Sequence, residues 1–111
     1  MTSGGDATIR GRLVMGDRVV AGMITTRGDA IAAVDLDEGQ RDAAGPFIAP
    51  GFVDVHVHGW GGHDAMGGPD ALAGMARALA RRGVTSFLPT AVSAPLANLG
   101  RFAATARAWQ S

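Results

Sequence analysis

The sequence contains no cysteine, no lysine and no tyrosine, and it has a single glutamate, Glu38. Without cysteine, neither a disulfide framework nor a thiolate metal site can form, which is consistent with a reducing cytosol. Ten basic residues, all arginine, balance ten acidic ones, so the formal net charge is zero and no basic surface for nucleic acid is expected. No apolar run approaches the roughly 20 residues that span a bilayer, and the first residues lack the features of a signal peptide. We therefore expect a soluble, cytoplasmic protein that binds neither nucleic acid nor a membrane.

Hydrophobic residues make up 47% of the 111 residues, which is enough for a folded core. Residues 9–15, 19–25 and 31–34 are short apolar runs separated by Gly/Asp turns, and a polar loop is predicted over residues 35–45. This spacing is typical of a small antiparallel meander. Because so few strands cannot bury both faces of a sandwich by themselves, we expect this sheet to pack against something else.

The most informative motif is His56-Val57-His58, at the end of an apolar, β-branched run that starts at Phe52. Strand side chains alternate with period two, so the two histidines point the same way. We expect the strand to be buried in a parallel sheet, with both imidazoles at its C-terminal end, where α/β folds build their sites. Neutral imidazole binds zinc and iron, and also admits manganese and cobalt. The spacing alone also fits two ordinary strand histidines, but the clustering of all three histidines between positions 56 and 63 favours a metal site.

Helix and strand alternate after this motif. A helix is predicted to begin at Pro69, which suits the first helical position, and to stop at Arg81-Arg82-Gly83. A second apolar strand is predicted over residues 84–90 and a second helix over residues 95–111. This order predicts two parallel βα units with right-handed crossovers. A closed (β/α)8 barrel needs eight units and about 250 residues, so we expect the chain to be part of a larger protein.

Three motifs carry a resemblance to a known family. Residues 50–59, PGFVDVHVHG, resemble the first barrel strand of the amidohydrolase superfamily. Residues 61–66, GGHDAM, and the more particular phrase GVTSFLPT at residues 83–90 are similar to the N-acetylglucosamine-6-phosphate deacetylase family within it. The resemblance implies an α/β fold in which residues 50–111 are the first two βα units of an incomplete TIM-like (β/α)8 barrel. Residues 1–49 would be the N-terminal part of a small β-sandwich domain.

The resemblance also implies a function. The intact enzyme would hydrolyse the N-acetyl group of a small amino-sugar phosphate, N-acetylglucosamine 6-phosphate, and release acetate in amino-sugar catabolism. It would use a divalent metal (zinc or iron first, manganese or cobalt next) with His56 and His58 as ligands, and it would be a homodimer. The family's bridging glutamate, two later histidines and catalytic aspartate have no counterpart in the 111 residues. We therefore assign no catalytic residue and expect the isolated chain to be inactive.

Other polar residues are given lesser roles. Asp54 is expected to have a structural role that supports the histidine pair. His63 is expected to lie in a glycine-rich loop and to face solvent or substrate. Glu38 precedes the barrel segment and cannot replace the bridging carboxylate. Two alternatives stay open: another amidohydrolase, dihydroorotase-like or imidazolone-hydrolysing, and a non-catalytic truncated remnant.

Overall fold

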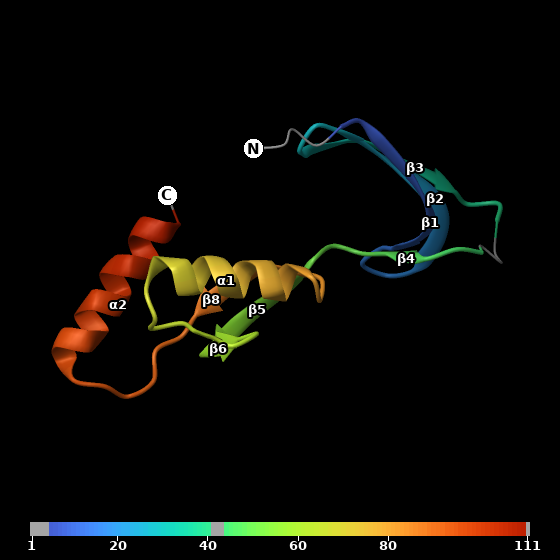
Figure 1. The fold of residues 1–111 in the computed structure, drawn as a ribbon. Helices are drawn as coiled ribbons and strands as arrows, with labels where there is room; N and C mark the ends of the chain where they lie inside the picture. Colours follow the sequence, from blue (N-terminus) through green and yellow to red (C-terminus); the bar gives the residue numbers. More distant parts are fainter. Residues whose placement is uncertain (1–4, 41–43, 111) are drawn as a thin grey trace. The chain divides into compact units, whose positions relative to one another are not determined.

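The computed structural model describes residues 5–40 and 44–110 (Figure 1). The chain divides into two compact units, Met1–Pro50 and Gly51–Ser111. The division coincides with Pro50-Gly51, where the sequence changes from the meander pattern to the histidine strand. The identities predicted for the two parts, a β-sandwich segment and the start of a TIM-like barrel, stay predictions.

The first unit is a four-stranded sheet with the order β3-β2-β1-β4. Its strands are β1 (Ala7–Val14), β2 (Val19–Arg27), β3 (Ala30–Asp37) and the two-residue β4 (Phe47–Ile48). The first three form the antiparallel meander that the sequence predicts, while β4 pairs parallel with β1. Two features were not foreseen: β4 itself, and the extension of β3 into the residues expected to begin a polar loop.

The meander has one apolar and one polar face. Ile9 lies opposite Ile24, which lies opposite Val34, and directly opposed residues share a face. The neighbouring rung runs from Arg10 on β1 to Asp35 on β3 and belongs to the other face. Ile9 and Val34 remain 46% and 48% exposed. The alternation of side chains along the strands therefore gives the sheet an apolar face. That face is only partly covered.

The second unit is built around a parallel pair of strands, as the βα pattern predicts. β5 (Phe52–Val57) pairs with β8 (Val84–Pro89), and helix α1 (Pro69–Ala80) lies between them in sequence. Helix α2 (Leu96–Trp109) follows β8. None of the helices in the described part of the chain is long and apolar enough to cross a membrane.

A small hairpin interrupts the connection from β5 to α1. Its strands are β6 (Gly59–Trp60) and β7 (His63–Asp64), which pair antiparallel around Gly61 and Gly62. Sequence analysis treated this segment as a loop. Strands of two residues are too short to produce the alternation by which strands are recognised.

The core of the second unit forms where α1 meets the strands. Leu72 and Met75 are fully buried, and Val57 and Ala65 complete the cluster. Leu72 and Met75 are three residues apart on α1 and therefore lie on the same face of the helix. Burial of a side chain of this size contributes about 1.5–3 kcal/mol relative to leaving it in water. This face of α1 therefore packs against the strands and forms the core.

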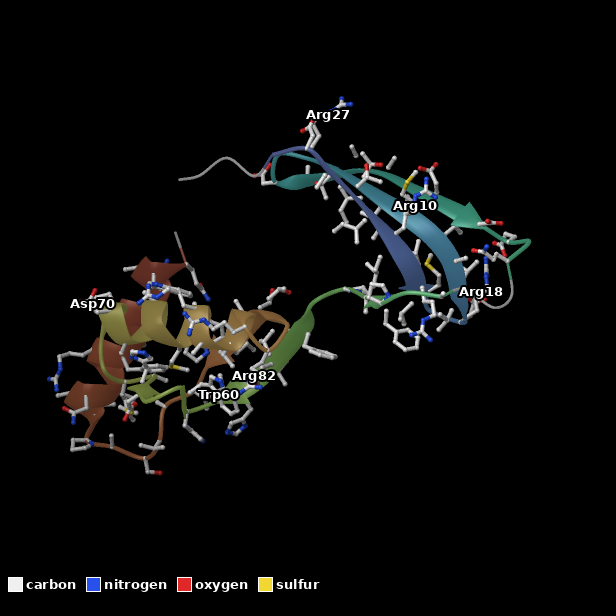
Figure 2. All side chains as sticks on the ribbon, turned by 45° about the vertical axis from the view of Figure 1, so that its right-hand side comes forward. Arg10, Arg18, Arg27, Trp60, Asp70 and Arg82 are labelled. Carbon is white, nitrogen blue, oxygen red and sulfur yellow. The ribbon has the colours of Figure 1, made fainter. Side chains whose placement is uncertain are left out.

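The ends of α1 follow local rules. Pro69 is the first helical residue, and Asp70 in the first turn places a carboxylate at the positive end of the helix dipole (Figure 2). After Ala80 the chain turns through Gly83, which has φ +83°, and its N–H donates to the Ala80 carbonyl at 3.0 Å. A left-handed residue of this kind is favourable only for glycine.

The prediction that the histidine strand is buried is wrong for the described residues. Phe52, Val53 and Val55 are 68%, 64% and 67% exposed, and Val57 alone on β5 is buried. The reason is that β5 pairs only with β8 in the described part of the chain, so its outer edge and most of its surface face solvent. β8 is likewise partly open, with Leu88 52% exposed. An apolar run in the sequence therefore indicates that a strand can be buried. It does not indicate which other part of the protein covers that strand.

Candidate metal centre

His56 and His58 meet at the C-terminal end of β5. Their Nε2 atoms are 3.1 Å apart, and the two rings are nearly perpendicular, with centroids separated by 4.9 Å. Both residues are exposed. The structure thus brings together the two side chains that the period-two spacing placed on one face, and it directs the same ring nitrogen of each toward the other.

Thr90, just past the end of β8, makes a contact that sequence analysis did not foresee. The Nδ1 atom of His58 lies 2.9 Å from the carbonyl oxygen of Thr90. Thr90 is itself anchored, because its N–H donates to the carbonyl of Val57 at 2.9 Å. The only signal in the sequence was the position of Thr90 at the exit of the next parallel strand, since such strand ends gather at one edge.

Asp54 supports the backbone at the pair. Its Oδ1 atom accepts a hydrogen bond from the N–H of His56 at 3.1 Å. The pairing register of β5 with β8 shifts between Asp54 and Val57, so the backbone departs from a regular ladder at this point. The carboxylate therefore binds a main-chain group that the irregular ladder leaves available.

His63 does not join the pair. It lies on β7, and among the described residues neither a hydrogen bond nor a ring contact links it to His56 or His58. Its ring instead occupies the space above Gly74 of α1, where a Cβ atom would overlap it. In the part of the chain that the structure describes, no group of three or more His, Cys, Asp or Glu side chains is arranged to hold a metal ion.

Glu38 forms an ion pair within the first unit. Its Oε1 atom accepts a hydrogen bond from Nη2 of Arg18 at 2.8 Å. This bond and the negative charges of Glu38 and Asp17 raise the pKa of the Arg18 guanidinium. Glu38 is thus a surface ion-pair partner.

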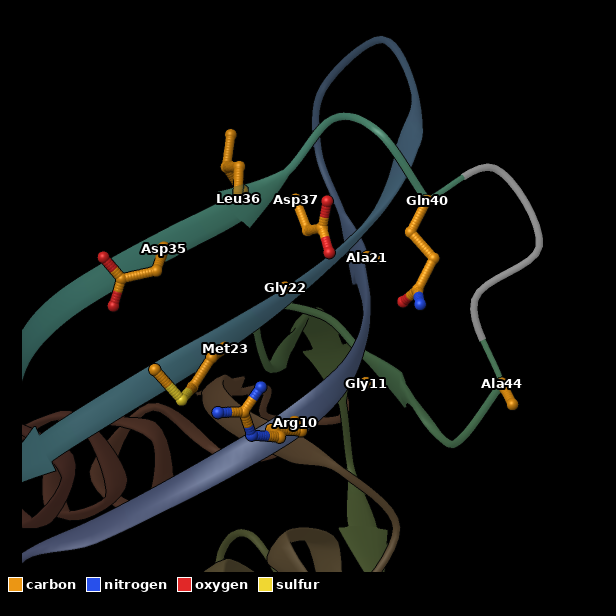
Figure 3. Close-up of a pocket in the computed structure, with 10 residues that line it drawn as sticks. All are labelled: Arg10, Gly11, Ala21, Gly22, Met23, Asp35, Leu36, Asp37, Gln40 and Ala44. Carbon is orange, nitrogen blue, oxygen red and sulfur yellow. The ribbon is translucent and has the colours of Figure 1, made fainter.

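The first unit also contains a cavity of about 290 Å³ against the polar face of its sheet (Figure 3). Arg10, Asp35, Asp37 and Gln40 contribute polar groups to its lining. The charged groups of the lining are one guanidinium, Arg10, and two carboxylates, Asp35 and Asp37. Neither histidine of the pair lines this cavity.

In sequence the chain is related to deacetylases of amino-sugar phosphates, and the resemblance predicted from its motifs is confirmed. The relatives include N-acetylgalactosamine-6-phosphate deacetylase of Escherichia coli O157:H7, 40% identical over 83 residues that cover 74% of this chain and 20% of the relative. N-acetylglucosamine-6-phosphate deacetylase of Vibrio furnissii is 43% identical over 75 residues, 62% of this chain and 19% of that protein. The Bos taurus protein of the same name is 44% identical over 61 residues, 51% and 15% of the two chains.

These matches cover only a small part of each relative. The chain spans 15–20% of the length of these three curated relatives. No protein-family model matches it. The similarity therefore establishes a relationship between this chain and sugar-phosphate deacetylases.

Proposed function

We propose that this chain supplies a metal-binding histidine pair to a metal-dependent deacetylase of a 2-acetamido sugar phosphate. The observation that carries the proposal is the convergence of His56 Nε2 and His58 Nε2 to 3.1 Å in a chain related to such deacetylases. Two further observations support the proposal. The pair is exposed, and it lies at the C-terminal end of a parallel strand, which is the edge of the sheet where α/β folds place their active sites.

The donor set fits a divalent transition metal. Zinc–nitrogen bonds are about 2.0–2.1 Å long, so two imidazole nitrogens on one ion lie at most about 4.2 Å apart. The 3.1 Å separation of the two Nε2 atoms satisfies that limit. Imidazole suits zinc and iron, with manganese or cobalt as the further candidates. His56 and His58 would hold the ion.

A bound ion of this kind lowers the pKa of water to about 7 and polarises the amide carbonyl, so that hydrolysis yields acetate and a free amine. The chain's own groups orient the ligands: the Thr90 carbonyl holds the His58 ring, and the Asp54 carboxylate holds the backbone at His56. Catalytic metal sites usually use three protein ligands plus water. With two imidazoles, the 111 residues bind metal but do not turn substrate over.

N-acetylglucosamine 6-phosphate is the proposed substrate, because the Vibrio furnissii and Bos taurus relatives are deacetylases of that compound. The 4-epimer, N-acetylgalactosamine 6-phosphate, is the second candidate because the E. coli relative carries that name. The proposal also includes an N-terminal β-sandwich segment, the start of a TIM-like barrel, a cytoplasmic location and a homodimer for the intact enzyme.

A chimera tests the proposal. The segment of the Vibrio furnissii deacetylase that matches this chain is replaced by the corresponding residues of this chain, and acetate release from both sugar phosphates is measured. We expect release from at least one of them, with loss in the His56→Ala and His58→Ala chimeras and retention in the His63→Ala chimera. A soluble chimera that retains its metal but releases no acetate from either substrate would refute the proposed function.

A further inference from the structure

The contact between His58 and Thr90 has a defined polarity. A carbonyl oxygen can only accept a hydrogen bond, so at 2.9 Å the Nδ1 atom of His58 must be the donor. Neutral imidazole carries one ring proton. In its neutral form, His58 is therefore held as the Nδ1–H tautomer, and its Nε2 atom presents a lone pair.

The polarity of the second contact follows from the first. Because Nε2 of His58 has no proton, the 3.1 Å contact between the two Nε2 atoms is a hydrogen bond that His56 donates. His56 is thus the Nε2–H tautomer in the metal-free chain. The two histidines look alike in sequence. Only His58, however, already presents an Nε2 lone pair to which a metal could bind.

Thr90 can impose this tautomer because it is fixed to the histidine strand. Its N–H donates to the carbonyl of Val57, the residue before His58, at 2.9 Å. Its hydroxyl donates to the Leu88 carbonyl at 3.1 Å, which orders the end of β8. The N–H of Thr90 therefore binds the main chain at Val57, and its carbonyl binds the ring of the next residue, His58.

We propose that Thr90 is a positioning residue for the metal pair: its main-chain carbonyl sets the tautomer and orientation of His58, so that His58 is the preformed ligand and His56 must change tautomer when a metal binds. The inference rests on the proposed function in that the pair is taken to be a metal site. A hydrogen bond to the second ring nitrogen is the usual means by which a protein fixes a ligating histidine.

Long-range ¹H–¹⁵N correlation spectra of the 111-residue chain, labelled at histidine ring nitrogens, test the tautomers directly. The sample is metal-free and is kept at alkaline pH. We expect a protonated Nδ1 for His58, a protonated Nε2 for His56, and a mixture of tautomers for His63, whose ring makes no hydrogen bond among the described residues. Assignment comes from single His→Gln variants. A tautomer mixture at His58, or identical spectra for all three rings, would overturn the proposal.

Zinc titration of the same sample provides the second arm. We expect the His56 pattern to convert to protonated Nδ1 while the His58 pattern keeps its proton on Nδ1. If the metal-free tautomers are as expected but zinc changes neither ring, the positioning role of Thr90 stands and the proposed metal function fails. If zinc binds but His58 is the ring that changes tautomer, the positioning role fails and the metal site stands.

Two substitutions separate the Thr90 main chain from its side chain. Thr90→Pro removes the N–H that donates to Val57, while Thr90→Ala keeps both main-chain groups and removes only the hydroxyl. We expect Thr90→Pro to give a tautomer mixture at His58 and to weaken zinc binding by about ten- to a hundredfold, as for other groups that orient a ligand. Thr90→Ala should retain the wild-type His58 tautomer. Loss of that tautomer in Thr90→Ala, or its retention in Thr90→Pro, would contradict the assignment to the main chain.

Discussion

The imidazole ring of His63 covers Gly74 so closely that a Cβ atom at Gly74 would overlap it. Gly74 is buried in the middle of α1, where glycine is otherwise unfavourable by about 0.8–1.0 kcal/mol relative to alanine. The missing side chain therefore has a structural reason: it lets strand β7 lie close against the helix.

Substitution of Gly74 by alanine tests this relationship. We expect Gly74→Ala to displace the His63 ring, visible as a change in its ring-proton chemical shifts, and to lack the stabilisation that alanine usually gives a helix. The matched control is Gly100→Ala in α2, where nothing lies within 4 Å of the added methyl group. That variant should gain about 0.4–1 kcal/mol in the free energy of unfolding. Equal gains from both substitutions would show that His63 does not constrain Gly74.

Leu72 is the best position at which to test the core of the second unit, because its side chain is fully buried. We expect Leu72→Ala to lower the free energy of unfolding by about 2–5 kcal/mol through lost burial and a cavity. Leu96→Ala is the control, because Leu96 is 84% exposed at the start of α2. That change should stay within about 0.5 kcal/mol. Urea unfolding followed by circular dichroism measures both, and comparable losses would place the core elsewhere.

The open surface of β5 predicts self-association of the 111-residue chain. Exposed apolar strands pair readily with other chains, and Val53 and Val55 are both about two-thirds exposed. We expect concentration-dependent sedimentation that the Val53→Thr, Val55→Thr double variant reduces while keeping β propensity. Val92→Thr serves as the control, since Val92 is 53% exposed but lies outside the strands. A chain that stays monomeric at every concentration would argue that this surface is not adhesive.

The ion pair of Arg18 with Glu38 gives a prediction about pH. Its partners raise the pKa of the Arg18 guanidinium, so the associated stability is fully present below the unfolded-state pKa and is lost only as pH rises through the folded-state value. Both values lie far above neutrality. We therefore expect Glu38→Gln to shift the melting temperature equally at about pH 6 and about pH 9.

Salt provides the check on that ion pair. Its two side chains are 48% and 62% exposed, so any effect of Glu38→Gln should shrink as salt screens the charges. Asp29→Asn removes the same charge from an aspartate that has no ion pair among the described residues, and it controls for net charge. A shift for Glu38→Gln that differs between the two pH values would contradict the assignment.

Much of the local structure was predictable because it depends on neighbours in sequence. The meander, the parallel pair and α1 with its Pro69 start and Gly83 stop all follow from alternation, periodicity and terminal residues. The predictions failed where pairing partners matter: β4, the hairpin of β6 and β7, and the exposure of β5. Those features depend on which strands meet, which short-range patterns do not encode.

By itself, the sequence determined that His56 and His58 share one face of a strand, because side chains in a strand alternate with period two. It also determined the relationship to deacetylases, because the motifs at residues 50–59 and 83–90 can be recognised without a structure. Only the tertiary structure decided that the two histidines differ. Thr90 reaches His58 across 32 positions of sequence through the pairing of β5 with β8, and that hydrogen bond determines which ring nitrogen carries the proton.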